Sequence, residues 1–438
     1  MKDDSTQGYL VTGPPTTVTS AGRRRRRAVT FSVAALVLVL VLALVGFGVF
    51  QYVSLTLGIK RSDVLGAGSA SGDTNILVMG LDSRLDENGN PLPKQIYNAL
   101  HAGDQSNGGL NANVLMLLHV PADGSKATEI SIPRDDYVQL AGCPDGECMG
   151  KIKQAYGLAY DQASRLLAGQ TGLDPTQRQQ KERDAGRKAQ ITTVSQFLGG
   201  VPIDHFVEVT LVAFYEIAQV VQPITVCVNA NTQDSYSGAS FHKGPQQINA
   251  AQALAFVRQR RDDTHPWLNF TDLDRERRQQ AFIASLAYQL KQADTFTNPI
   301  KLTRILDVAK QNTAIDSGLD LLSFVGQASS LTGGNVTYFT LPIDHFGKDP
   351  LGEDVNYVNL PLIQATVSHL LAPPTSASAK PAPVTSHPTS STTATAGPSP
   401  STTEPAPATP VQAAGPGVTA PPPTALSALS GGGIQCVK

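Results

Sequence analysis

Five consecutive arginines, residues 23–27, run directly into an uncharged apolar stretch, residues 28–50, and this junction constrains the chain more than any other feature. About 20 apolar residues in a helix span the roughly 30 Å hydrocarbon core of a bilayer, and arginine clusters stay on its cytoplasmic side. We therefore expect residues 1–27 to be a cytoplasmic basic head and residues 28–50 to be a single transmembrane helix. Everything after the helix then lies outside the cytoplasm.

The alternative for this segment is a cleaved secretory signal. The apolar core of such a signal usually has about 7 to 15 residues and ends in small residues at the cleavage site. Here the apolar stretch is longer, and the bulky Phe47, Phe50 and Tyr52 stand where small residues would be expected. The sequence favours the retained anchor. An extracytoplasmic location, together with basic residues that lack interleaved aromatics, also argues against nucleic acid as a ligand.

The C-terminal part of the chain, residues 372–438, consists largely of Pro, Ala, Ser, Thr and Gly. Such a composition buries too little apolar surface to offset the entropy cost of ordering, so we expect a disordered tail. One folded domain remains, from residue 73 to residue 371. Its roughly 300 residues are ample for one large core.

The four cysteines are expected to form disulfides outside the cytoplasm. Cys143 and Cys148 lie in the short segment CPDGEC and are predicted to close a local ring. Four cysteines allow three connectivities, so the partners of Cys227 and Cys436 stay open at this point. A zinc site is disfavoured, because no neighbouring histidine completes a set of four ligands.

Strand-like and helix-like segments alternate along the folded part, without internal repeats. This order predicts an α/β (α+β) sandwich in which a central mixed β-sheet has helices on both faces. A polar, Gly/Asn-rich insertion, residues 85–113, is expected to be an exposed flap. We predict strands over 74–80, 114–120, 127–132, 206–209, 224–228 and 336–341, and helices over 155–167, 175–198, 212–221, 249–257, 272–290, 300–311 and 319–330.

Arginines recur at the ends of these predicted elements or on one helix face. A guanidinium grips phosphate oxygens in a bidentate way, so several that converge would imply a ligand with more than one phosphate. Asp272, Arg275 and Gln279 share a helix face by their spacing. Arg183, Arg261 and Arg277 are instead expected to be solvated surface charges or salt-bridge partners. The arginines predicted to converge are Arg84, Arg134, Arg258, Arg260, Arg275 and Arg278.

Asp82 follows the first predicted strand and is the natural candidate for a metal ligand. Mg²⁺ commonly takes one or two carboxylates together with phosphate oxygens, so one acid beside a polyphosphate would suffice. The alternative is that Asp82 caps the turn that follows. The sequence has none of the nucleophile-elbow, P-loop or HExxH signatures, which disfavours hydrolase and NTPase functions.

Five segments in their order resemble the signature blocks of the LytR-CpsA-Psr family. They are NILVMGLDSR at 75–84, ISIPRDDYV at 130–138, KIKQAYGLA at 151–159, QALAFVRQR at 252–260 and DLDRERRQQ at 272–280. The HAGD at 101–104 is similar to the mycobacterial and related actinobacterial branch. The resemblance covers a signature core over residues 73–290, and the single membrane helix also fits it.

The resemblance implies an extracytoplasmic, membrane-anchored phosphotransferase. It would take a glycopolymer, arabinogalactan by the branch, from a polyprenyl-pyrophosphate carrier and join it to a peptidoglycan hydroxyl, usually the muramyl 6-OH, with Mg²⁺ or Mn²⁺. Asp82 would bind the metal, and Asp272 would orient arginines or help to deprotonate the acceptor. Arg84 and Arg134 would act with Asp272 in catalysis, and Gln279 would line the site. The pyrophosphate would be held by Arg84, Arg134, Arg258, Arg260, Arg275 and Arg278.

One position departs from the family pattern. Many members carry a second metal-binding acid just before the second strand, where this chain has Asn113, which offers an oxygen but no charge; Asp104 in the flap is an alternative ligand. This departure supports a second hypothesis, a non-catalytic wall-tethered binder of polyprenyl carriers or peptidoglycan. The apolar stretches 211–221 and 282–290 are predicted to be ordinary core, with a channel for the lipid tail as the alternative.

Overall fold

The computed structural model describes residues 53, 58–66, 68–69, 72–101, 103, 109–292, 299–320, 334–372 and 428–438. The chain divides into two units, residues 1–58 and 59–438, and the second is described below. The predicted basic head, the predicted transmembrane helix at 28–50 and most of the predicted helix at 319–330 lie outside the described residues. Within the described residues, every helix is too short or too polar to cross a bilayer.

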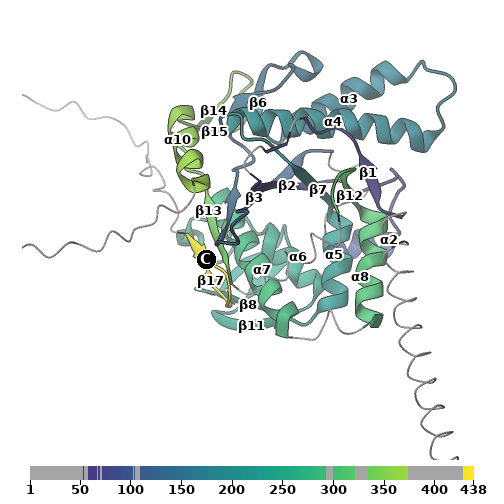
Figure 1. Cartoon of the computed structure of the whole chain (residues 1–438). Helices are drawn as coiled ribbons and strands as arrows, with labels where there is room; N and C mark the ends of the chain where they lie inside the picture. Colours follow the sequence, from purple (N-terminus) through teal and green to yellow (C-terminus); the bar gives the residue numbers. More distant parts are fainter. Residues whose placement is uncertain are drawn as a thin grey trace, which may run out of the picture. The chain divides into compact units, whose positions relative to one another are not determined.

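A central sheet of eight strands, counted among the described residues, forms the middle layer of the fold (Figure 1). Its pairs are both parallel, as between β2 and β7, and antiparallel, as between β2 and β3, so the predicted mixed sheet is confirmed. In spatial order the strands are β1 (Lys60–Ser62), β12 (Thr313–Asp316), β7 (His205–Thr210), β2 (Thr74–Leu81), β3 (Ala112–Val120), β4 (Ala127–Ser131), β13 (Val336–Thr340) and β16 (Leu429–Ser430).

Helices cover both faces of this sheet, as predicted (Figure 1). One face packs against α3 (Gln154–Leu167), α4 (Pro175–Phe197) and α10 (Leu360–Leu371). The other face carries α5 (Leu211–Val221), α6 (Ala250–Arg258) and α7 (Asp272–Gln292), and α8 (Pro299–Asn312) packs beside α5.

Alternation along the central strands decides which side chains reach which face. In β2, Leu77, Met79 and Leu81 are buried in the core under α3, α4 and α10. The residues between them, Val78 and Gly80, face the opposite side and line a cavity under α5, α6 and α7. This is the period of two expected for a strand whose side chains point alternately to the two faces of a sheet.

The predicted flap at 85–113 is only partly exposed. It contains the helix α2 (Lys94–Leu100), in which Leu100 is fully buried. The Tyr97 hydroxyl donates to the Arg84 carbonyl oxygen at 2.8 Å and accepts from the Leu92 amide at 2.8 Å. The apolar face of α2 therefore packs the flap onto the domain. Asp104, the alternative metal ligand, lies outside the described residues.

The prediction of a disordered tail is wrong for residues 428–438. Strand β16 pairs with β13, and β17 (Cys436–Val437) pairs in parallel with β8 (Ile224–Val228), which also pairs with β11 (Gly244–Ile248). Leu429 and Val437 are buried, and this apolar burial distinguishes the segment from the Pro/Ser/Thr-rich stretch before it. Cys227 and Cys436 form a disulfide that ties β17 to β8.

The remaining described strands form short hairpins around the main layers. The Cys143–Cys148 disulfide predicted from the CPDGEC segment is present, in the connection between β5 (Tyr137–Gln139) and β6 (Met149–Lys151). The other hairpins are β9 (Thr232–Asp234) with β10 (Ala239–Phe241), and β14 (His345–Lys348) with β15 (Asp354–Tyr357).

Candidate functional site

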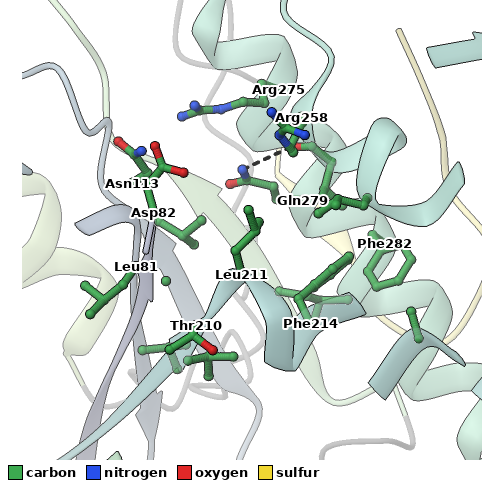
Figure 2. Close-up of a pocket in the computed structure, with 18 of the residues that line it drawn as sticks. Leu81, Asp82, Asn113, Thr210, Leu211, Phe214, Arg258, Arg275, Gln279 and Phe282 are labelled. Atoms are coloured by element: carbon green, nitrogen blue, oxygen red, sulfur yellow. Dashed lines mark hydrogen bonds between the residues drawn. The ribbon is translucent and has the colours of Figure 1, made fainter. Parts of the chain in front are cut away.

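A cavity of about 380 Å³ lies between the central sheet and helices α5, α6 and α7. Polar side chains gather at one end of it, where Asp82 and Asn113 face Arg258, Arg275 and Gln279, and the apolar side chains lie further along (Figure 2). The apolar lining includes Val78, Met116, Val209, Leu211, Phe214, Ile217, Leu254, Phe282, Ile283 and Leu286. The prediction that 211–221 and 282–290 are ordinary core is therefore incomplete, because both stretches also form the cavity wall.

A β-bulge positions the two metal candidates. Gly80 pairs with Val114 and Leu81 pairs with Ala112, so that Asn113 is the extra residue in β3. A Cβ on Gly80 would lie 2.8 Å from the Val114 Cβ, which explains why glycine is needed at this close approach. A bulge bends a strand and redirects its side chains. Here it brings Asn113 beside Asp82, the residue that follows β2.

The Asp82–Asn113 pair has the chemistry of a small hard-cation site. The Asp82 carboxylate forms an ion pair with Arg84, and its side chain is 31% exposed. The Asn113 Oδ1 atom is buried and has no hydrogen-bond partner, although a buried amide oxygen normally has one. Carboxylate and amide oxygens suit Mg²⁺. The described residues hold no group of three or more His, Cys, Asp or Glu placed to bind a metal.

Asp272, the first residue of α7, holds three of the predicted arginines. Arg134 donates to both of its carboxylate oxygens, from Nε at 3.2 Å and from Nη2 at 3.3 Å. Arg275 donates from Nη2 at 2.8 Å, and the Arg260 Nε lies 3.3 Å from Oδ1. An acid at a helix N-terminus is favoured by the helix dipole. Both the helix dipole and the three arginines therefore stabilise the Asp272 carboxylate.

Burial affects these arginines differently. Burial disfavours the charged form of Arg134. The attraction of the Asp272 and Asp135 carboxylates outweighs this effect, so the pKa of Arg134 is raised. For Arg275, burial lowers the pKa to about 10 despite the nearby Asp272, and its buried Nε has no hydrogen-bond partner. The Arg275 guanidinium stays charged at neutral pH. Its neighbours offset only part of the cost of burying this charge. An anionic ligand would supply the missing compensation.

The chain leaves α6 in an extended conformation that sends alternate side chains to opposite sides. Arg258 and Arg260 both line the cavity, whereas Gln259 between them is fully buried, and its side chain contacts Thr232 and the Arg261 carbonyl. Arg258 also donates to the Leu100 carbonyl at 2.7 Å, which attaches the end of α2 to the site. Burial lowers the Arg258 pKa. Among the residues that the structure describes, the cavity lining thus contains five arginines and one carboxylate, that of Asp82.

Arg278 is the predicted site arginine that the structure does not bring to the cavity. It is fully buried, donates from Nε to the Lys438 carbonyl at 2.6 Å, and lies among the rings of Phe241, Phe256 and Phe270. The reason is helical geometry, because about 100° separates successive residues around the axis. Gln279 faces the cavity and donates to the Val257 carbonyl at 3.2 Å, so its neighbour Arg278 points elsewhere.

A buried ion network, which the sequence did not indicate, anchors the loop after β2. Arg183 and Arg187 of α4 contact Glu87 of that loop and Glu208 of β7, and all four side chains are fully buried. Arg183 is therefore a salt-bridge partner, one of the two roles expected for it, and not a solvated charge. The network fixes the loop that carries Arg84. Arg261 is exposed, as expected, and lies 4.8 Å above the ring of Tyr236, a cavity residue that no sequence pattern had indicated.

Comparisons with known proteins identify the family and several relatives of the chain. The LytR_cpsA_psr family model matches residues 55–366, more than half of the chain. The chain is 36% identical over 361 residues to the "Cell wall biosynthesis protein LcpA" of Corynebacterium glutamicum, covering 80% of this chain and 66% of that protein. It is 25% identical over 249 residues to the "Polyisoprenyl-teichoic acid--peptidoglycan teichoic acid transferase TagU" of Bacillus subtilis, covering 57% of this chain and 63% of that protein.

The match to each of these relatives thus spans slightly less than two thirds of the relative's length. Among solved structures, the "LytR-Csp2A-Psr enzyme from Actinomyces oris" is similar with a TM-score of 0.47 and 18% identity, covering 71% of this chain and 95% of that one.

Proposed function

The chain belongs to the LytR_cpsA_psr family, and we propose that it is a phosphotransferase that moves a glycopolymer from a polyprenyl-pyrophosphate carrier onto a peptidoglycan hydroxyl, the muramyl 6-OH. The observation that carries the proposal is the convergence of arginines at one end of an apolar cavity (Figure 2). A ligand that suits this cavity has a polyanionic head and a long apolar tail. A polyprenyl pyrophosphate has both.

In the proposed reaction, the acceptor hydroxyl oxygen attacks the phosphorus that carries the glycopolymer. The bond from this phosphorus to the bridging oxygen breaks, and polyprenyl phosphate leaves with the electron pair. The hydroxyl proton passes to solvent, and the product is a phosphodiester. Such a transfer depends mainly on positioning and on neutralising charge, which Arg84, Arg134 and Arg275 would supply. Both oxygens of Asp272 already accept from arginines, so we assign it to positioning them.

We further propose that the site takes Mg²⁺ or Mn²⁺. Asp82 and Asn113 would hold the ion, and the unpartnered Asn113 Oδ1 supports this assignment. When bound, the ion would neutralise charge on the pyrophosphate oxygens. The single carboxylate agrees with a cation that takes most of its other ligands from phosphate and water.

The proposed location and substrate follow from the sequence. The arginine run at 23–27 and the apolar segment 28–50 support a single-pass membrane protein with a cytoplasmic N-terminus and a domain that faces the cell wall. The resemblance to the actinobacterial branch favours arabinogalactan on a decaprenyl carrier as the donor. The partners would then be membrane lipid, the lipid-linked glycopolymer and the peptidoglycan acceptor.

The test is transfer by the purified full-length chain, with polyprenyl-pyrophosphate-linked oligosaccharide as donor, peptidoglycan as acceptor and MgCl₂. We expect Arg134→Ala to lower turnover by about a hundredfold or more, and EDTA to stop the reaction until Mg²⁺ is restored. Arg165→Ala is the matched control, because Arg165 is an exposed arginine on α3 that pairs with Asp145. Transfer that survives both EDTA and Arg134→Ala would refute the proposal.

The second candidate is a non-catalytic binder of polyprenyl carriers or peptidoglycan. Asn113 favours it, because an amide in place of a second acid gives a weaker cation site. This function predicts polyprenyl lipid retained by the purified protein but no transfer product at any divalent-ion concentration. Mass spectrometry of the detergent-solubilised protein, before and after incubation with peptidoglycan and MgCl₂, separates the two functions.

A further inference from the structure

Two loops join to form one wall at the polar end of the cavity. One is the β9–β10 hairpin, and the other is the segment that follows Arg260. The Gln233 amide donates to the Asp262 carboxylate at 2.9 Å, the Ser235 amide donates to Asp263 at 2.6 Å, and the Asp263 amide donates to the Gln233 carbonyl at 2.7 Å. The wall is continuous with the site, because Tyr236 of the hairpin and Arg260 both line the cavity.

This wall presents two large aromatic side chains to solvent. Tyr236 is 67% exposed although it lines the cavity, and Trp267 is 74% exposed. Both are supported by charged or polar neighbours. The Arg261 guanidinium lies 4.8 Å over the Tyr236 ring, and His265 packs edge-on to Trp267 at 4.9 Å. His265 in turn lies 3.3 Å from the Asp262 carboxylate.

Tyr236 lines the cavity, so a ligand bound there lies next to this wall. In the proposed donor, the chemical group next to the pyrophosphate is a saccharide, and the acceptor is a saccharide as well. One face of a pyranose ring presents C–H groups that pack against the electron-rich face of an aromatic ring. Tyrosine and tryptophan give such contacts at a low cost in side-chain entropy. The neighbouring Asp262 and Asp263 carboxylates argue against an anionic membrane surface as the occupant.

We propose that Tyr236 and Trp267 form a saccharide-stacking platform at the mouth of the cavity, held in place by Arg261 and the Asp262–His265 contact. The platform binds a sugar ring of the transferred glycopolymer or of the acceptor peptidoglycan. The inference rests on the proposed function for the identity of these two saccharides. It assigns a role to Arg261 and to the chain's single tryptophan.

The single tryptophan allows a direct test that needs no turnover. The intrinsic fluorescence of the full-length chain is titrated with soluble GlcNAc–MurNAc fragments of peptidoglycan and, separately, with arabinogalactan oligosaccharide. We expect one of these probes to cause a saturable shift of the Trp267 emission. Tyr236→Ala should weaken this binding roughly five- to tenfold, Tyr236→Phe should retain it, and Phe346→Ala, which removes an exposed aromatic residue of β14, should not change it.

Transfer kinetics identify the source of the sugar. Trp267→Ala should raise KM about five- to tenfold for the glycosylated donor or for peptidoglycan, whichever occupies the platform, with little change in kcat, and Trp267→Phe should restore KM. The proposal is overturned if neither saccharide shifts the fluorescence, or if only vesicles of phosphatidylglycerol and cardiolipin do. Failure of the proposed function is a separate outcome. If the wild-type protein shows no transfer, the fluorescence titration with saccharides still tests whether the platform binds sugar.

Discussion

Asp272 is the residue on which the charge balance of the site depends most. Its two oxygens contact Arg134, Arg260 and Arg275, three cations that otherwise repel one another. Asp272→Asn keeps the size of the side chain but removes its charge. We expect turnover to fall by about a hundredfold, with a folded domain by circular dichroism. The matched control is Asp307→Asn, at a half-exposed acid of α8 that pairs with Lys310. Wild-type turnover of Asp272→Asn would contradict this role.

Glu129 gives a residue-scale prediction about stability and pH. It lies on β4, where burial raises its pKa to about 8 although Ser131 and Gln280 donate hydrogen bonds to it. The pKa of Glu129 in the folded protein lies above its unfolded value of about 4.5. The contribution of Glu129 to stability is therefore complete below pH 4.5 and is lost as the pH rises through about 8.

We therefore expect Glu129→Gln to change little at pH 5 and to stabilise the domain at pH 9, by on the order of 2–4 kcal/mol. Chemical denaturation at both pH values measures this difference. Equal effects of the substitution at pH 5 and pH 9 would contradict a neutral, buried Glu129.

Most residues of the site could be predicted from the sequence, but the direction in which each side chain points could not. Positions at element ends and on one helix face selected five arginines that do line the cavity: Arg84, Arg134, Arg258, Arg260 and Arg275. Arg278 was misplaced, because spacing along a helix face does not reveal which neighbouring aromatic rings enclose a side chain. Tyr236 was missed, since tertiary contacts that spacing does not reveal, among them those with residues 262 and 263, place its loop at the cavity.

At the scale of elements, the bulge at the end of β2 and β3 decides where the metal candidates lie. Gly80→Ala would place a Cβ 2.8 Å from the Val114 Cβ. The two strands must then move apart, so we expect a loss of about 1–3 kcal/mol of stability and a higher Mg²⁺ concentration for half-maximal transfer. Gly66→Ala is the control, because nothing lies within 4 Å of its added Cβ. Unchanged stability and Mg²⁺ dependence would contradict this role of the bulge.

Long elements with clear periodicity were predictable, and short ones were not. The predicted helices at 155–167 and 272–290 correspond closely to α3 and α7. In contrast, β1, β12 and β16 have two to four residues each, too few to show an alternation. Arg183 and Arg187 are buried on the face of α4 that packs against the sheet. Because these two residues are charged, the sequence of α4 shows no clear apolar face.

At the scale of the whole molecule, a disulfide joins two distant parts of the sequence. Cys227 and Cys436 are 209 residues apart, whereas Cys143 and Cys148 are 5 apart. Constraint of the unfolded chain increases with loop length. We expect the double replacement Cys227→Ser, Cys436→Ser to cost roughly 3–5 kcal/mol in denaturant unfolding.

The same replacement of Cys143 and Cys148 is the matched control and should cost clearly less. Equal costs for the two pairs would contradict this account. The long-range pairing itself could not be deduced from the sequence, because the composition of residues 372–438 conceals the two apolar residues, Leu429 and Val437, that fix its end to the domain.

The central claim is that the arginine-lined cavity binds a diphosphate attached to an apolar chain. The most direct measurement is calorimetric binding of decaprenyl pyrophosphate and of decaprenol, in the same detergent, to the wild-type protein and to Arg275→Met. The account predicts that the pyrophosphate binds at least about a hundredfold more tightly than the alcohol, and that Arg275→Met removes most of this difference while Arg165→Met does not. Equal affinity for the two lipids would contradict it.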